Sequence, residues 1–449
     1  MAEASDLSSG CRKAKTLDKR LLAGLSMAGL LILGGCVALV WRPGIEPVPP
    51  PTAASFAPAE VARGQVLAAA GNCAVCHTSD PGHPYAGGVG FASSFGTIYS
   101  TNITPDAATG IGRWSQAAFT RAMHEGVARD GSHLFPAFPY DHFTKVSNGD
   151  LEALYAFLMT QTPVVATDRK NDLPFPLNIR ALQAGWKLLY FRPGRYVPDS
   201  ARSPSWNRGA YLGEGLAHCA ACHSPRNALG AEDPRQAYGG AVVDGWIAPA
   251  LTDANPSSQI WSEQELFAYL RSGVTDAHGS AVGPMSSVVH EGLSALPDGD
   301  IHAIAAYYAD LSQGTARHVG NSAGIDRSIK TSDVGVGQVN DVDARLYVAA
   351  CAACHYSSGP DPTAQRPDLA LNSALRLDQP TNLIQVVLHG VGAAEGDPLV
   401  MMPGFAGALS DADITRLIAY LRRTRTGLPP WADVEPQVAM IRKARTQAP

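Results

Sequence analysis

The chain has 449 residues, of which 45% are hydrophobic and 17% are charged. This length is too great for one ordinary hydrophobic core, and it predicts two to four domains. The formal net charge of −5 is small and no basic stripe appears, so the composition argues against a nucleic-acid-binding protein. The 44 glycines and 33 prolines favour many loops and short helices.

An uncharged stretch, Leu21–Trp41, follows a basic N-terminal segment. A helix of this length spans roughly 30 Å, which is enough to cross the hydrocarbon core of a bilayer. Because several Lys and Arg residues precede the stretch, the positive-inside bias predicts a transmembrane anchor with the rest of the chain outside the cytoplasm. A cleaved signal peptide and a lipid anchor at Cys36 are the alternatives.

Three motifs of the form Cys-x-x-Cys-His follow, and they use six of the eight cysteines. Two cysteines three positions apart lie on one side of a helical turn, so both can add to the vinyl groups of one haem while the adjacent histidine reaches the iron. A single pair could instead be redox-active or bind zinc, but three copies predict three covalently bound haems c. The predicted thioether cysteines are Cys73, Cys76, Cys219, Cys222, Cys351 and Cys354, and the predicted axial histidines are His77, His223 and His355.

Each motif opens a repeat of one helical pattern. A helical lead-in precedes the motif, a second helix follows and ends in Gly-Val, and an amphipathic helix closes the repeat. We therefore predict an all-α fold, in which three tandem cytochrome c domains follow the N-terminal transmembrane helix. The predicted segments are the anchor at 21–41, domain 1 at 56–163, a packed connector at 164–199, domain 2 at 200–314, a linker at 315–341, domain 3 at 342–428 and a C-terminal tail at 429–449.

A methionine is the predicted sixth ligand of the second and third irons. Met285 stands twelve residues after Gly273, and Met402 stands twelve after Gly390, which favours Met402 over Met401. A thioether is a usual axial ligand in electron-transfer cytochromes. The alternative is that these methionines only fill gaps in the core.

The first repeat has Phe138 at the corresponding position, and phenylalanine cannot bind iron. We predict His142, further along the same proline-bounded loop, as the sixth ligand of the first iron. Met123 is the alternative ligand, and an open or water-bound iron is a third alternative. Imidazole ligation would make haem 1 the centre of lowest potential. Surface or loop positions are predicted for the remaining histidines that we considered, namely His83, His133, His278, His290 and His389.

Several longer stretches resemble the tri-haem cytochrome c subunits of membrane-bound periplasmic dehydrogenases of bacteria. They include "GNCAVCHT", "TNITPDAATGIGRW", "FPLNIR", "WNRGAYLGEGLAHCAACHSPRNALGA", "GPMSSVV" and "MMPGFAGALSDADI". The resemblance implies an electron-transfer subunit, without substrate chemistry of its own, that passes electrons from a catalytic subunit to membrane ubiquinone or another respiratory acceptor. It also implies a location at the bacterial inner membrane, with the haem domains in the periplasm.

The loop "LFPAFPYDHFTK" of the first repeat narrows this resemblance. Family members that serve quinone-dependent or flavin-dependent dehydrogenases usually carry methionine in this loop. The phenylalanine form looks more like members associated with molybdenum hydroxylases, such as nicotinate dehydrogenase, and it implies a catalytic partner with molybdenum and iron–sulfur centres. The alternative functions are a multi-haem peroxidase, in which an open first iron would meet peroxide, and a cytochrome subunit of a terminal oxidase.

Overall fold

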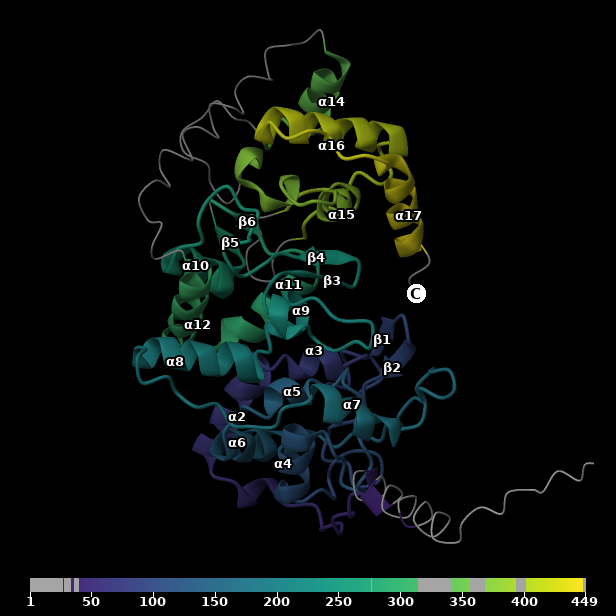
Figure 1. Cartoon of the computed structure of the whole chain (residues 1–449), viewed down its shortest axis with the longest axis vertical. Coiled ribbons are helices and arrows are strands. Elements are labelled where there is room, and N and C mark those ends of the chain that lie inside the picture. The colour runs from purple at the N-terminus through teal and green to yellow at the C-terminus, as the bar shows by residue number, and fades with distance from the viewer. Residues whose placement is uncertain are drawn as a thin grey trace, which may run out of the picture.

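The computed structural model describes residues 40–275, 277–313, 341–355, 368–392 and 401–446, together with Met27, Gly34 and Gly35. Three groups of short helices follow one another along the long axis of the molecule in chain order (Figure 1). Each group contains one Cys-x-x-Cys-His motif, and we refer to the groups in chain order as domains 1, 2 and 3.

Domain 1 is built on two helices, α2 and α6, that cross at close range. Gly64 on α2 lies so near α6 that a Cβ atom at this position would be 1.9 Å from the carbonyl oxygen of Ala153. Ser115 and Ser147 begin two of the helices, because each side chain accepts a backbone N–H bond of the first turn. The elements are η1 (Ala53–Ser55), α2 (Pro58–Ala70), α3 (Cys73–His77), α4 (Gln116–Glu125), α5 (Tyr140–Phe143) and α6 (Asn148–Met159).

Domain 2 repeats this construction. Gly209 on α8 approaches Ala303 on α12 as closely as Gly64 approaches Ala153. A capping box of Ser262 and Glu265 begins α10. The elements are α8 (Pro204–Tyr211), η2 (Leu212–Leu216), α9 (Ala220–His223), η3 (Pro234–Gln236), α10 (Glu263–Ser272), α11 (Pro284–Ser287), η4 (Val288–Gly292), η5 (Leu293–Ala295) and α12 (Asp298–Leu311).

The segment between these domains packs against both of them. Its helix α7 (Leu182–Tyr190) is fixed from two sides. Trp186 Nε1 donates to the carbonyl oxygen of Leu229, and Lys187 Nζ donates to the carbonyl oxygens of Glu125 and Gly126 at the end of α4. A cation at a helix C-terminus satisfies carbonyls that have no partner within the helix.

Domain 3 has its own hydrophobic core, whose fully buried members include Tyr347, Ile384 and Leu417. A second capping box, made by Ser410 and Asp413, begins its longest helix. The described elements are α14 (Val342–Ala350), η6 (Leu369–Leu371), η7 (Ser373–Leu375), α15 (Thr381–His389), α16 (Asp411–Thr426) and α17 (Val434–Thr446).

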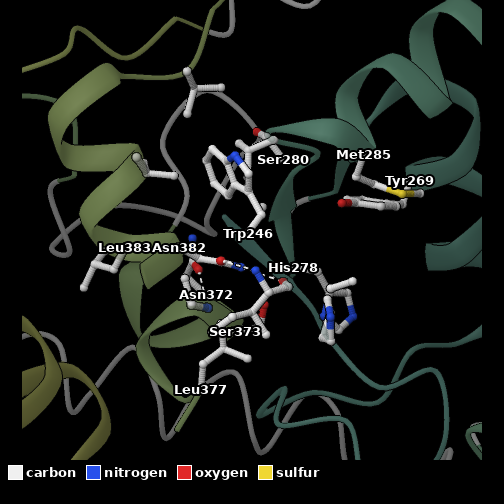
Figure 2. A pocket seen from close by; sticks show the side chains of 18 of the residues that line it. Trp246, Tyr269, His278, Ser280, Met285, Asn372, Ser373, Leu377, Asn382 and Leu383 are labelled. Atoms are coloured by element: carbon white, nitrogen blue, oxygen red, sulfur yellow. Dashed lines mark hydrogen bonds between the residues drawn. The ribbon is translucent and has the colours of Figure 1, made fainter. Parts of the chain in front are cut away.

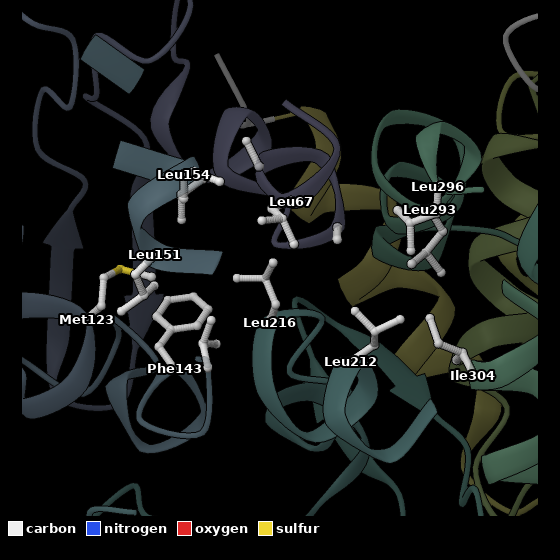
Figure 3. Packing of buried hydrophobic residues seen from close by; sticks show 14 of the residues in the cluster. Leu67, Met123, Phe143, Leu151, Leu154, Leu212, Leu216, Leu293, Leu296 and Ile304 are labelled. Atoms are coloured by element: carbon white, nitrogen blue, oxygen red, sulfur yellow. The ribbon is translucent and has the colours of Figure 1, made fainter. Parts of the chain in front are cut away.

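Domains 1 and 2 share a single core, unlike domain 3. Leucines of α2 and α6 in domain 1 and of η2 and η5 in domain 2 belong to one continuous buried cluster (Figure 3). Leu216 is 2% exposed and lies between the two sets. The first two domains therefore form one packed body.

The prediction of an all-α fold is wrong, because the described chain contains three antiparallel two-stranded hairpins. The second hairpin turns at Asp244 and Gly245, which both have positive φ, and an Asp-Gly pair favours this type of two-residue turn. The strands have only two to four residues, too few for alternation to show. They are β1 (Gly90–Ser93) with β2 (Gly96–Tyr99), β3 (Ala241–Val243) with β4 (Trp246–Ala248), and β5 (Val274–Thr275) with β6 (Gly279–Ser280).

The predicted transmembrane helix is not supported either. Within the described part of the chain, no helix combines the length and the hydropathy that crossing a bilayer requires. Most of segment 21–41 lies outside the described residues, as do positions 315–340 of the predicted linker.

Candidate haem sites

The three Cys-x-x-Cys-His motifs each occupy a tight turn of chain. The first motif is α3, the second includes α9, and the third forms consecutive turns at residues 351–355. Asn72 and His218, directly before the first two motifs, take left-handed backbone conformations that redirect the chain. None of these six cysteines forms a disulfide within the described part of the chain.

The first two motif histidines are oriented for metal binding. His77 Nδ1 donates to the carbonyl oxygen of Thr101, and His223 Nδ1 donates to that of Pro249, each at 2.7 Å. This arrangement leaves Nε2 of each imidazole as the free ligand atom, and such second contacts are typical of histidines that bind metals. Burial lowers the pKa of both imidazoles, which favours the neutral form that binds iron.

The second and third motifs open into one cavity of about 390 Å³ between domains 2 and 3 (Figure 2). The cavity contains a complete haem c ligand set from each domain: thiols, an imidazole and a thioether. A buried imidazole, His278, also lines the cavity, and its Nε2 makes no hydrogen bond. The residues therefore fit covalently bound haem, with the predicted ligands in the lining: Cys219, Cys222, His223, Met285, Cys351, Cys354, His355 and Met402.

Met285 and Met402 each stand twelve residues after a glycine, but they do not occupy equivalent backbone positions in domains 2 and 3. Val274 pairs with Ser280 in domain 2, whereas Val391 pairs with Met402 in domain 3. Met402 therefore corresponds in the backbone to Ser280 and not to Met285. Both Met401 and Met402 line the cavity, but Met401 is 72% exposed, so burial still favours Met402. Residues 393–400 of this loop lie outside the described part.

Met123 occupies a position on α4 that lines a haem site in the other repeats. Its counterparts by sequence, Leu270 and Val387, both line the cavity between domains 2 and 3. Met123 itself is 5% exposed and packs in the cluster that contains Phe143 and Leu151 (Figure 3). The structure thus places Met123 on the face that would cover haem 1.

His142 lies elsewhere, at the contact between domains 1 and 2. Its Nδ1 is 2.9 Å from the carbonyl oxygen of Glu214, and its Nε2 is 2.7 Å from Oε1 of Glu232. Burial alone would lower the pKa of His142, but Glu232 and Asp141 raise it above the ordinary value. Because both ring nitrogens are occupied, ligation of iron 1 by His142 would require one of these hydrogen bonds to break. This arrangement differs from the predicted one.

Two histidines that we assigned to surface or loop positions are buried. His133 is 4% exposed and accepts from Lys187 Nζ at 3.1 Å, and His278 is 6% exposed. His278 stacks on Trp261 with ring centroids 3.6 Å apart. Sequence spacing could not reveal this contact, because the two residues are brought together only by the hairpin that follows α10.

The first and second attachment sites are neighbours. Burial raises the pKa of the Cys76 thiol to about 11, and the nearby Cys222 contributes to the same shift. The α2–α3 corner also packs on domain 2, since Gly71 lies against the side chain of Leu216. Site 1 therefore adjoins site 2, and site 2 shares its cavity with site 3.

Comparison with known proteins agrees with this geometry. The sequence model of the cytochrome c family matches residues 61–162 and 344–425. Over 425 residues, or 94% of its length, the chain is 47% identical to a nicotinate dehydrogenase subunit of Pseudomonas putida, but it spans only 35% of that relative. It is 37% identical to the fructose dehydrogenase cytochrome subunit of Gluconobacter japonicus over 90% of this chain and 85% of the relative. The cytochrome c subunit of a quinone-type alcohol dehydrogenase of Gluconacetobacter polyoxogenes is 36% identical over 81% of this chain and 80% of the relative.

Proposed function

This chain belongs to the family of cytochrome c subunits of dehydrogenases and is an electron-transfer subunit, and on this basis we propose that it carries three haems c in series. The observation that supports the proposal most directly is the adjacency of the three sites. Cys76 of site 1 lies near enough to Cys222 of site 2 for that thiol to contribute to its raised pKa, and sites 2 and 3 open into one cavity. A haem c, when bound, supplies one-electron exchange at its iron.

The protein's own groups perform three tasks in this proposal. The paired cysteines fix each macrocycle, and the carbonyl oxygens of Thr101 and Pro249 hold the axial imidazoles in one orientation. Met285 and Met402 line the cavity and would offer thioethers to bound haems. The apolar lining would limit the access of water to these haems.

We propose a molybdenum-containing dehydrogenase as the electron donor and ubiquinone as the acceptor, with the haem domains in the bacterial periplasm. The support for the donor is the higher identity to a nicotinate dehydrogenase subunit, 47%, than to the fructose and alcohol dehydrogenase cytochromes, 37% and 36%. The relatives are named as dehydrogenase subunits, which favours this role over the peroxidase and terminal-oxidase alternatives.

A pyridine haemochrome assay on the purified chain tests the haem content. We expect close to three haems per chain, because each of the three motifs supplies two cysteines and a histidine. A ratio near two would contradict the proposal. Alkylation of unreacted thiols, followed by peptide mass analysis, would then identify the motif that remains empty.

Isolation of the native complex tests the donor. We expect molybdenum and iron in excess of the haem iron in the purified complex, and reduction of the haem α-band on addition of nicotinate or a related N-heterocycle. A complex that contains flavin or a quinone cofactor without molybdenum would refute this donor. It would leave the electron-transfer function intact.

A further inference from the structure

We propose that His278 binds a propionate carboxylate of the haem in site 2 through its Nε2, and that this contact raises the reduction potential of that haem. The inference rests on the proposed haem content. It adds a binding role for a side chain outside the attachment motif and the axial ligands.

The imidazole of His278 is held rigidly. It stacks on the indole of Trp261 with an interplanar angle of 11° and ring centroids 3.6 Å apart. Its backbone N–H donates to Thr275 Oγ1 at 2.9 Å, and its Nδ1 lies 3.1 Å from Ser257 Oγ. These contacts fix the ring plane, so Nε2 has a defined direction.

The hydrogen bonds around Ser257 are compatible with a proton on Nε2 of His278. The backbone N–H of Gln259 donates to Ser257 Oγ at 3.4 Å, and the hydroxyl hydrogen of Ser257 can donate to His278 Nδ1. In this arrangement Nδ1 is an acceptor, and the neutral ring carries its hydrogen on Nε2. The ring therefore presents a donor on its far side.

Nε2 makes no hydrogen bond of ordinary geometry, and His278 is only 6% exposed. Glu265 Oε2 lies 3.5 Å from Nε2, at ion-pair distance, and it also accepts from the backbone N–H of Ser262 at 2.9 Å. Buried donors in native proteins are nearly always satisfied, by protein, by water or by a ligand. An unpartnered donor in the lining of a ligand cavity therefore indicates a group that the cavity receives.

The cavity lining explains why this group is a carboxylate of haem. A haem carries two ionised propionates, and burial of an ionised carboxylate is costly unless a donor or cation meets it. None of the described lining residues is Lys or Arg, and the ionisable nitrogen groups of the lining are four imidazoles. His223 and His355 are the predicted axial ligands, and burial lowers the pKa of His218 to about 4. His278 is the remaining imidazole (Figure 2).

The contact has a direct electrostatic consequence. A propionate close to the macrocycle stabilises the ferric state, because that state carries one more positive charge. A donor that binds the propionate withdraws part of its negative charge and shifts the balance toward the ferrous state. Site 1 has no histidine at the equivalent position. In domain 2, His278 stands two residues before Ser280, which pairs with Val274. In domain 1, Gly131 stands two residues before His133, which pairs with Val127.

The test compares His278→Leu with a matched control, His302→Leu, in the full chain loaded with haem. His302 also stacks on an aromatic ring, that of Phe267, at 3.8 Å, and also lies near a glutamate of α10, Glu263, at 3.7 Å. It is half exposed and does not line the cavity. The two substitutions therefore each remove an imidazole with similar neighbours, but only the imidazole of His278 lines the proposed haem cavity.

Redox titration of the α-band measures the effect, and a Met285→His reference variant marks the site 2 component. For His278→Leu we expect a roughly tenfold lower ferrous-to-ferric ratio of haem 2 at a fixed potential, which equals ~59 mV for a one-electron couple. His278→Gln, whose amide can still donate, should restore most of the potential. His302→Leu should leave it unchanged.

The haem count separates the two levels of the proposal. An unmodified chain without haem at site 2 would refute the proposed haem content itself. A haem-loaded His278→Leu variant with an unchanged haem 2 potential would overturn the role of His278 alone. If His278→Leu loses haem 2, the comparison moves to His278→Gln and His278→Asn. Equal potentials in that pair would overturn the proposal, and a lower potential in the shorter Asn variant would support it.

Discussion

The two contacts between successive domains are built in different ways. Domains 1 and 2 share a hydrophobic core and a partly buried polar cluster, in which Glu214 accepts from Lys145 Nζ at 2.9 Å and from Tyr307 OH at 2.6 Å. Domains 2 and 3 meet around a cavity, beside a short polar contact between Asn382 and the backbone of Ile247. Protein side chains fill the contact between domains 1 and 2. The contact between domains 2 and 3 instead surrounds a cavity whose lining contains the predicted haem ligands.

This difference shows what each contact depends on. Side chains of the chain itself fix the distance between sites 1 and 2. The distance between sites 2 and 3 depends on the groups that fill the cavity, because a hollow of about 390 Å³ would otherwise forfeit packing contacts on every wall. Domain 3 is therefore expected to be the part of the electron path that is most sensitive to haem loading.

The largest effect is expected from the double substitution Cys351→Ala and Cys354→Ala. It removes covalent attachment at site 3, so we expect one haem fewer per chain and loss of stable docking of domain 3. Limited proteolysis should then cut preferentially after residue 313, while the fragment that contains domains 1 and 2 keeps its haems and its unfolding transition. Equal protease resistance in the variant and the unmodified protein would show that the cavity does not depend on its haem.

A smaller effect is expected from His142→Ala, which leaves Glu232 without its partner at the domain 1–2 contact. Removing one member of a buried pair costs on the order of 3 kcal/mol of unfolding free energy. Chemical denaturation should show this loss in the transition of domains 1 and 2, and the EPR spectrum of haem 1 should stay unchanged. Disappearance of a bis-imidazole EPR signal would instead establish His142 as an iron ligand.

The same pair predicts a pH dependence. The pKa of His142 is raised in the folded protein. Its contribution to the free energy of unfolding is therefore fully present below the ordinary pKa of 6.5 and is lost as the pH rises through the higher folded pKa. The pKa of Glu232 is lowered, so its contribution is present above 4.5 and is lost as pH falls. The stability difference between the unmodified protein and His142→Ala should therefore be largest between pH 4.5 and 6.5. A difference that grows above about pH 7 would contradict this assignment.

The smallest effect is expected from Asn382→Ala at the other contact. The side chain accepts from the N–H of Ile247 and donates to its carbonyl oxygen, both at 2.8 Å. The contact is partly exposed, so we expect a loss of about 1 kcal/mol, seen as a modest fall in the melting temperature of domain 3. A loss as large as that of His142→Ala would show that the polar contact, rather than the cavity, secures domain 3.

The features that could be predicted from sequence are those that depend on local spacing. The attachment motifs, the helices that follow them and the capping box at Ser262 follow from neighbours within a few positions. The hairpins were missed because strands such as β3 are too short for periodicity, although the Asp-Gly turn at 244–245 was a usable signal.

Tertiary contacts account for the remaining differences. His142 is close to the first haem loop in sequence, but its partners Glu214 and Glu232 come from domain 2. The register that linked Met285 to Met402 counted residues through a loop of different construction in domain 3. In both instances the outcome depends on which distant segment occupies the same space, and local spacing carries no information about that.

The attachment thiols are weak nucleophiles in the folded chain. Burial raises the pKa of Cys73 to about 12 and that of Cys219 to about 11, while both side chains remain partly exposed. A thiol with such a pKa is almost entirely protonated at neutral pH, and it reacts slowly because the thiolate is the nucleophile. If haem is attached at these two sites as proposed, we expect the attachment to be faster before α2 and α8 are fully packed than after.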